Sequence, residues 1–183
     1  MIHWLVLAGG ASTRFGRDKS RAVLHGRTLI DHALEAVAST GHSSGHTVVG
    51  PEHSGGPAAA VVSVLTAVDA PLVGVLAVDM PFAEQALASL VPTVESEASH
   101  DDVDAWVPVG PDGRRQWLCA VYRRRALLRV ADERDDWRDA PFHGLVADLV
   151  MTEVPITSRT SLLDIDTPDD YERAHGIAND LRA

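Results

Sequence analysis

The chain of 183 residues opens with a near-continuous apolar run, IHWLVLA at residues 2–8, which ends at two glycines. Such a run is typical of a strand that is buried on both faces, as in a parallel sheet covered by helices on both sides. Helices predicted at 28–39 and 57–68 follow, and a second apolar strand is predicted at 72–78, so strands and helices alternate along the chain. The sequence therefore predicts an α/β chain built around a buried parallel sheet.

The second half of the chain interrupts this alternation with a predicted hairpin, in which strands at 105–109 and 117–122 flank a Pro-Asp-Gly turn. We expect a three-layer, doubly wound, mostly parallel (Rossmann-like) sheet with a small antiparallel hairpin excursion. No linker or repeat divides the sequence, so residues 1–183 are expected to form a single domain. The other predicted elements are strands at 46–49 and 151–154, helices at 83–91, 124–131, 143–149 and 168–177, and a surface loop at 95–104.

Composition argues against several classes of protein. The net charge of −10 disfavours nonspecific binding to nucleic acid, which needs a basic face. No apolar run approaches the roughly 18 residues that cross a membrane, and the N-terminal stretch lacks the basic region of a signal peptide. Cys119 is the single cysteine, it lies in an apolar run, and we expect it in the core. We expect a cytoplasmic protein with neither nucleic-acid nor membrane partners.

Basic residues gather directly after the first strand. Five of the 16 in the chain fall within residues 14–27: Arg14, Arg17, Lys19, Arg21 and Arg27. Ligands of open α/β sheets bind at the carboxyl ends of strands, and a glycine-rich loop there can aim N–H groups at an anion. The hydroxyls of Ser12 and Thr13 would add to the positive charge around a di- or triphosphate. The spacing matches neither a Walker A loop nor a dinucleotide fingerprint. We favour a nucleotide-phosphate loop, with a plain strand-exit loop as the alternative.

The stretch LAGGASTRFGRDKS at 7–20 resembles the signature L-A-G-G-x-S-x-R-[MF]-G-x-D-K of the MobA-like nucleotidyltransferases. This family includes molybdenum cofactor guanylyltransferase and related cytidylyltransferases. Three later stretches resemble family motifs in the same order: SGGPAAAV at 54–61, LAVDMPF at 76–82 and LLDIDTPDDYERA at 162–174. The resemblance therefore extends over most of the chain.

The resemblance implies an attack on the α-phosphate of a nucleoside triphosphate, with Asp79 holding Mg²⁺. Asp164 and Asp166 would share one face of an extended backbone, and we expect Asp166, next to the Thr-Pro cap, to be the second metal ligand. Lys19 would neutralise charge in the transition state, and Arg14 would bind the leaving pyrophosphate. The alternative for Asp79 is a structural role, in which it only ends the strand. The alternative for Asp166 is that it only supplies a polar side chain in front of the helix that starts at Pro168. The residues expected to bind the nucleotide are Leu7, Ala8, Gly9, Gly10, Ser12, Thr13, Arg14, Lys19, Gly56 and Pro57.

The expected reaction transfers GMP from GTP to molybdopterin cofactor, and molybdenum-cofactor or molybdoenzyme assembly proteins are the expected partners. One alternative uses CTP or another phosphorylated acceptor, and a second is a noncatalytic nucleotide-binding relative. Two departures from the family pattern motivate the noncatalytic alternative. Residues 51–55 form a shortened segment, and the stretch at 139–149 lacks the basic cluster that the family often carries there.

Lys19 is the one lysine among 16 basic residues, because the other 15 are arginines. An arginine spreads its charge over a bulky planar fork and does not reproduce a compact ammonium at a crowded phosphate. We predict that Lys19→Arg folds normally, as judged by its circular dichroism and melting temperature, and loses most of its activity. Turnover near that of the wild type would contradict a special role for this lysine.

Overall fold

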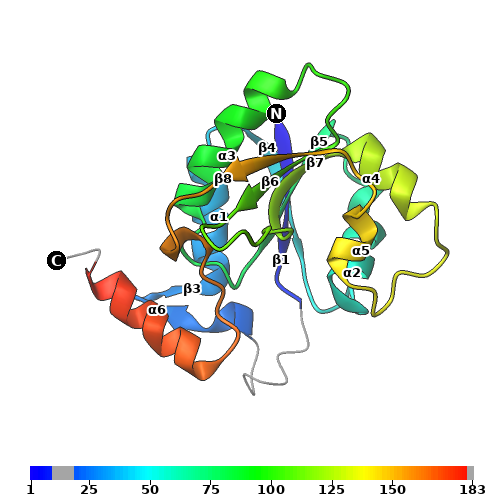
Figure 1. Ribbon diagram of the computed structural model, residues 1–183. Helices are drawn as coiled ribbons and strands as arrows, with labels where there is room; N and C mark the ends of the chain where they lie inside the picture. The colour runs from blue at the N-terminus through cyan, green and yellow to red at the C-terminus, as the bar shows by residue number, and fades with distance from the viewer. Residues whose placement is uncertain (10–18, 181–183) are drawn as a thin grey trace.

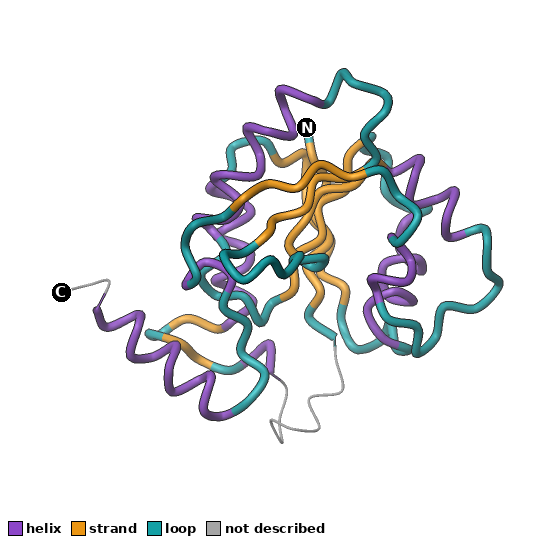
Figure 2. The backbone as a smooth tube through the Cα atoms, in the orientation of Figure 1, coloured by secondary structure: helices purple, strands orange, loops and turns teal. Residues whose placement is uncertain are grey.

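The computed structural model describes residues 1–9 and 19–180, and its centre is a six-stranded sheet (Figures 1 and 2). The strand order is β4-β1-β5-β7-β6-β8, and all strands run parallel except β7, which is antiparallel to both of its neighbours. The strands are β1 (Ile2–Leu7), β4 (Ser43–Val49), β5 (Leu72–Ala77), β6 (Ala105–Val109), β7 (Cys119–Arg123) and β8 (Met151–Pro155). The predicted mostly parallel sheet with a hairpin excursion is confirmed.

Helices cover both faces of this sheet, which gives the expected three layers. Figure 1 shows α1 and α3 on one side and α2, α4 and α5 on the other. Each side has its own core cluster, because alternate residues of the buried strands point to opposite faces. The helices are α1 (Leu29–Ser39), α2 (Gly56–Leu65), α3 (Glu84–Glu97), α4 (Arg124–Ala131), α5 (Phe142–Val146) and α6 (Pro168–Asp180).

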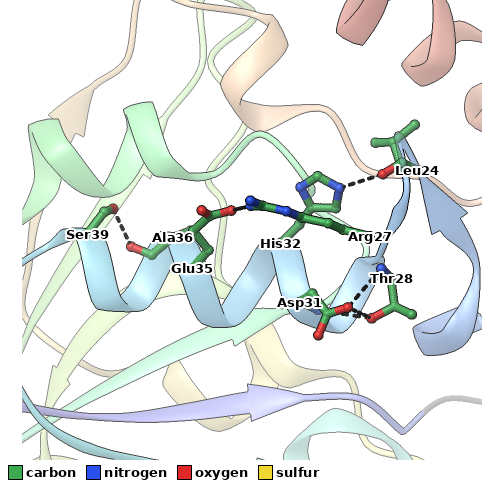
Figure 3. A network of polar contacts seen from close by, with 8 residues as sticks. All are labelled: Leu24, Arg27, Thr28, Asp31, His32, Glu35, Ala36 and Ser39. Atoms are coloured by element: carbon green, nitrogen blue, oxygen red, sulfur yellow. Dashed lines mark hydrogen bonds and ion pairs between the residues drawn. The ribbon is translucent and has the colours of Figure 1, made fainter.

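The start of α1 is fixed by a capping box that Figure 3 shows in detail. The Thr28 hydroxyl accepts a hydrogen bond from the Asp31 N–H at 3.2 Å, and the Asp31 carboxylate accepts one from the Thr28 N–H at 3.0 Å. The hydrogen bonds from Thr28 lower the pKa of the Asp31 carboxyl. The predicted N-cap is therefore confirmed. A further turn along, Glu35 forms an ion pair with Arg27.

Helix α3 extends beyond its prediction, which ended at Val91 and left residues 95–104 as a loop. The structure continues the helix through Pro92 to Glu97, and Val94 is fully buried against the sheet. The Glu97 carboxylate accepts hydrogen bonds from Trp106 Nε1 and Thr152 Oγ1, each at 2.9 Å. Contacts with distant strands thus extend this helix past the point where local sequence favours an end.

The edge strand β4 was predicted to begin at His46 and in fact begins at Ser43. Ser43 pairs with Ile2, and Gly45 pairs with His3 in β1. The burial of its residues alternates, as expected of an edge strand. Backbone pairing with β1 extends the strand over Ser43–Gly45, which the sequence suggested as a turn.

A small second sheet was not predicted. It consists of β2 (Val23–Leu24) and β3 (Arg27–Thr28), and it lies beside α6 away from the main sheet (Figure 1). Leu24 and Leu29 pack there with Ile165 and Ala174, and the Tyr171 hydroxyl donates to the Val23 carbonyl. This cluster attaches α6 to the rest of the fold. In the part of the chain that the structure describes, every helix is too short or too polar to cross a bilayer.

Gly74 tests the packing of the central strands. It pairs with Trp4 across β1 and β5, and a Cβ at this position would overlap the fully buried Trp4 ring. We expect Gly74→Ala to lower the free energy of unfolding by about 1–3 kcal/mol through overpacking, measured by urea denaturation.

A matched glycine in α6 serves as the control. A Cβ at Gly176 would meet no atom within 4 Å, so Gly176→Ala should raise the free energy of unfolding by roughly 0.5–1 kcal/mol. Equal effects of the two substitutions would contradict this account of the core.

Candidate functional site

The carboxyl ends of β1, β4 and β5 meet at one edge of the sheet. Because β1 lies between β4 and β5, the chain turns to opposite sides of β1 in successive crossovers, and this edge is the switch point where such sheets bind ligands. The Ala8 N–H donates to the Val49 carbonyl at 2.9 Å, and the Val78 N–H donates to the Leu7 carbonyl at 3.1 Å. The residues that follow the three strands are therefore held side by side.

Gly9 lies directly against the chain that leaves β4. A Cβ at this position would come within 2.8 Å of the Gly50 carbonyl oxygen and 2.9 Å of the Gly50 carbonyl carbon. Neither backbone can give way as a flexible side chain would. Of the predicted nucleotide-binding residues, Leu7 is buried at the end of β1, Ala8 is half-buried, and Gly9 is exposed at the edge.

Helix α2 begins at the same edge. Its N-cap Gly55 has φ of +103° and its first residue Gly56 has φ of +87°, which are backbone conformations that favour glycine. Pro57 lies in the first turn, where a missing N–H costs nothing. Glycine offers no capping side chain, so no side chain of the N-cap competes for the N–H groups at the helix start, where the helix dipole favours negative charge. The predicted residues Gly56 and Pro57 thus lie at the edge that Gly9 also lines.

Asp79 follows β5, and a backbone hydrogen bond connects it with the C-terminal part of the chain. The Ile165 N–H donates to the Asp79 carbonyl at 2.9 Å. Ile165 is fully buried, whereas Asp164 and Asp166 are exposed and Asp79 is half-buried. The structure thus brings together the segments of the two predicted metal ligands, which are 87 positions apart in the sequence.

The backbone at Asp166 is held by the cap of α6. The Asp170 carboxylate accepts hydrogen bonds from the N–H groups of Asp166 and Thr167, at 3.3 and 3.0 Å, and from the Thr167 hydroxyl at 2.7 Å. These bonds, led by that of the Thr167 hydroxyl, lower the pKa of the Asp170 carboxyl. The Asp170 N–H in turn donates to the Thr167 hydroxyl at 3.2 Å, so the predicted N-cap at Thr167 is confirmed, and it fixes the backbone next to Asp166.

The donor set fits some metals better than others. Among the described residues, no group of three or more His, Cys, Asp or Glu side chains can hold a metal ion. A site built from Asp79 and Asp166 therefore offers two carboxylates as hard oxygen ligands, without nitrogen or sulfur. Mg²⁺ is typically bound through one or two carboxylates together with substrate phosphates and water, so these residues fit that ion.

Most of the remaining predicted residues follow Gly9 in the sequence. Gly10, Ser12, Thr13 and Arg14 lie outside the described residues. Lys19 begins the short 3₁₀ helix η1 (Lys19–Arg21), and its side chain is likewise outside the description. Cys119 is fully buried, and burial raises the pKa of its thiol to about 12, as expected of a core residue.

Two residues at this edge were missed by the sequence prediction. The Glu52 carboxylate accepts a hydrogen bond from the Gly50 N–H at 3.2 Å within the short loop after β4. Arg138 lies against the start of α2, because a Cβ at Gly55 would come within 2.8 Å of its Cγ. Hydrogen bonds from Arg138 lower the pKa of the Asp136 carboxyl to about 2. The sequence around Arg138 indicates only a charged loop. Its contact with Gly55 joins residues more than 80 positions apart, and local sequence does not predict such a contact.

Comparison with known proteins decides the family. A family model for the MobA-like NTP transferase domain matches residues 4–140, three quarters of the chain. The chain belongs to the MobA-like NTP transferase family. Members of this family are nucleotidyltransferases, and the chain is a nucleotidyltransferase. The matched region contains Gly9, Gly56 and Asp79 and ends before Asp166.

Individual relatives agree with the family assignment. A protein of Bacillus anthracis named "Probable molybdenum cofactor guanylyltransferase" is 31% identical over 145 residues, which cover 69% of this chain and 70% of the relative. The molybdopterin-guanine dinucleotide biosynthesis protein A of Archaeoglobus fulgidus has a similar structure, with a TM-score of 0.71, 20% identity and coverage of 97% and 99% of the two chains.

The fold is also shared with the 2-C-methyl-D-erythritol 4-phosphate cytidylyltransferase of Thermus thermophilus. The TM-score is 0.64 at 18% identity, with coverage of 96% of this chain and 98% of the other. The two structural similarities confirm the α/β nucleotidyltransferase fold.

Gly9 provides a test of the glycine-lined edge. Gly9→Ala would force the ends of β1 and β4 apart, so we expect the Kd for a nonhydrolysable nucleoside-triphosphate analogue to rise roughly tenfold or more, measured by calorimetry. Gly144→Ala is the control, because its Cβ would make only an ordinary 3.7 Å contact with Pro141. Unchanged nucleotide affinity in Gly9→Ala would show that the close contact between Gly9 and Gly50 plays no part in nucleotide binding.

Proposed function

We propose that this nucleotidyltransferase transfers GMP from GTP to molybdopterin cofactor. An oxygen of the acceptor's phosphate attacks the α-phosphorus of GTP, a new P–O–P linkage forms, and the bond to the β-phosphate breaks with release of pyrophosphate. The choice of GTP and molybdopterin rests on the relatives, among them one at 31% identity named "Probable molybdenum cofactor guanylyltransferase".

The observation that carries the proposed chemistry is the arrangement around Asp79. Phosphoryl and nucleotidyl transfers depend mainly on positioning and on neutralisation of charge. Gly9 and the start of α2 lie on the β4 and β1 side of Asp79 and offer backbone N–H groups to a triphosphate. The backbone contact with Ile165 brings Asp166 to the same region. This arrangement supports an anionic substrate with its reacting phosphate near Asp79.

Mg²⁺ is the proposed cofactor, and Asp79 and Asp166 would hold it. When bound, Mg²⁺ would neutralise part of the negative charge on the phosphates. Lys19 would bind the phosphates of the nucleotide, and Arg14 would bind the pyrophosphate that leaves. Asp170 would orient Asp166 through its hydrogen bond to the Asp166 N–H.

A second candidate keeps the same chemistry with CTP as the nucleotide. The fold similarity to a cytidylyltransferase supports it. The loop of residues 51–55 is short and leaves few side chains beside the nucleotide edge. Glu52 is the one acidic residue in that loop, and it accepts a hydrogen bond from Gly50. We favour GTP because the guanylyltransferase relative is more similar in sequence than the cytidylyltransferase.

Pyrophosphate release tests the proposal. Purified protein with Mg²⁺ and molybdopterin should release pyrophosphate with GTP and not with CTP, ATP or UTP. Release with CTP alone would replace the guanylyl assignment by the cytidylyl one. No release with any nucleotide and molybdopterin would contradict the proposed acceptor.

Asp79→Asn should reduce kcat by roughly hundredfold or more, because a neutral amide would hold the proposed Mg²⁺ less tightly than a carboxylate and so weaken the neutralisation of phosphate charge. Asp102→Asn is the matched control, since Asp102 is exposed in the loop before β6 at the opposite edge of the sheet. The melting temperatures of both variants should stay near that of the wild type. An Asp79→Asn enzyme with full turnover would exclude this carboxylate from the reaction.

A further inference from the structure

A cavity of about 260 Å³ lies beside the region of Asp79, and arginines dominate its lining. Its walls come from three separate segments: the hairpin turn between β6 and β7, residues 159–164 after β8, and helix α6. The charged residues of the lining are Arg114, Arg115, Arg159, Arg173, Asp112 and Asp164. Four positive charges against two negative ones give the cavity a local charge opposite to that of the whole chain, which is −10.

The four arginines are not equally engaged with other protein groups. Arg115 forms an ion pair with Glu153 at 2.6 Å, and Arg173 lies 4.0 Å from Asp170. For Arg114 and Arg159, no side-chain ion pair is found within the residues that the structure describes. These two guanidinium groups therefore have their donors available to a bound anion.

Backbone contacts hold the walls of the cavity together. The Gly110 N–H donates to the Arg114 carbonyl at 3.0 Å and closes the hairpin turn. The Ile156 N–H donates to the Val109 carbonyl at 2.8 Å, which ties the exit of β8 to the end of β6. A Cβ at Gly110 would come within 3.2 Å of Leu162 Cδ1, so the turn packs closely on the short helix η2 (Thr160–Leu162).

The cavity lies on the opposite side of Asp79 from the glycine-lined edge. Strands β6 and β8 are parallel to β5, so the loops that follow them leave the sheet at the same edge as Asp79. Along that edge, β4 and β1 precede β5, whereas β6 and β8 come after it. Asp164 lines the cavity and is bonded directly to Ile165, whose N–H donates to the Asp79 carbonyl. One wall of the cavity is thus a single residue away from this contact.

We propose that the arginine cavity binds the phosphate group of the acceptor and holds it next to Asp79. This inference rests on the proposed function, because it places the acceptor on the β6 and β8 side of β5 and the nucleotide on the β1 and β4 side. Planar guanidinium groups bind phosphate oxygens through paired hydrogen bonds, and arginine does this better than lysine. The cavity also supplies the basic side chains that residues 139–149 lack, and Arg114, Arg115 and Arg159 come from outside the stretches that resemble family motifs.

The double variant Arg114→Ala/Arg159→Ala tests this assignment. Both side chains are exposed and without ion pairs to the described residues, so the fold should persist, which the melting temperature would verify. In the pyrophosphate-release assay, we expect the KM for molybdopterin to rise roughly tenfold or more, while the KM for GTP changes by about twofold or less. Arg159→Lys should give an intermediate KM for molybdopterin, since it keeps the charge and loses the planar fork.

The control is Arg125→Ala, an exposed arginine at the opposite edge of the sheet, paired there with Asp101. It should leave both KM values unchanged. An unchanged KM for molybdopterin in the double variant would overturn the proposal. Equal increases in both KM values would also overturn it, because the arginines would then act on the nucleotide or on the fold.

A binding experiment separates failure of this proposal from failure of the proposed function. Equilibrium dialysis with inorganic phosphate alone should show one phosphate site fewer in the double variant than in the wild type. Equal phosphate binding by the two proteins would exclude the cavity, whatever the enzyme transfers. A wild type that shows no transfer but loses a phosphate site on mutation would refute the proposed function and retain the cavity as an anion site.

Discussion

The pairing of β1 with two parallel neighbours is the constraint on which the rest of the structure depends. A strand buried on both faces exposes no side chain to water, and its backbone groups must find partners on both sides. β4 and β5 supply those partners over the whole length of Ile2–Leu7. Because parallel strands need crossover helices, the same pairing requires helices around the sheet and brings three carboxyl ends to one edge.

Positive charge is concentrated in two places although the net charge of the chain is negative. The chain carries −10 overall, yet one basic cluster follows the first strand and a second surrounds the cavity at the exits of β6 and β8. At physiological ionic strength, charges more than about 8 Å away are largely screened, so a phosphate at this edge responds mainly to nearby cations. Acidic residues elsewhere discourage long polyanions while leaving small anionic ligands free to bind.

The sequence correctly predicted the features that depend on interactions between residues close together in the chain. The apolar run at 2–8, the capping residues Thr28 and Thr167 and the end of a strand before Asp79 depend on near neighbours, and each was confirmed as a structural element. The length of α3 was mispredicted, because it depends on the contacts of Glu97 with two distant strands. The arginine cavity was missed for the same reason, since Arg114 and Arg159 are 45 positions apart and only the parallel run of β6 and β8 brings them together.

The hydrogen bond from Ile165 to Asp79 joins two segments that are synthesised at different times. When a nascent chain has emerged through β7, it contains both neighbours of β5 and the glycine-lined edge, but not the residues around Ile165. The interior of the sheet can thus form while the second carboxylate and one wall of the cavity are still being translated. Since chains are synthesised at about 5–20 residues per second, a few seconds separate the completion of the glycine-lined edge from that of the Ile165 contact.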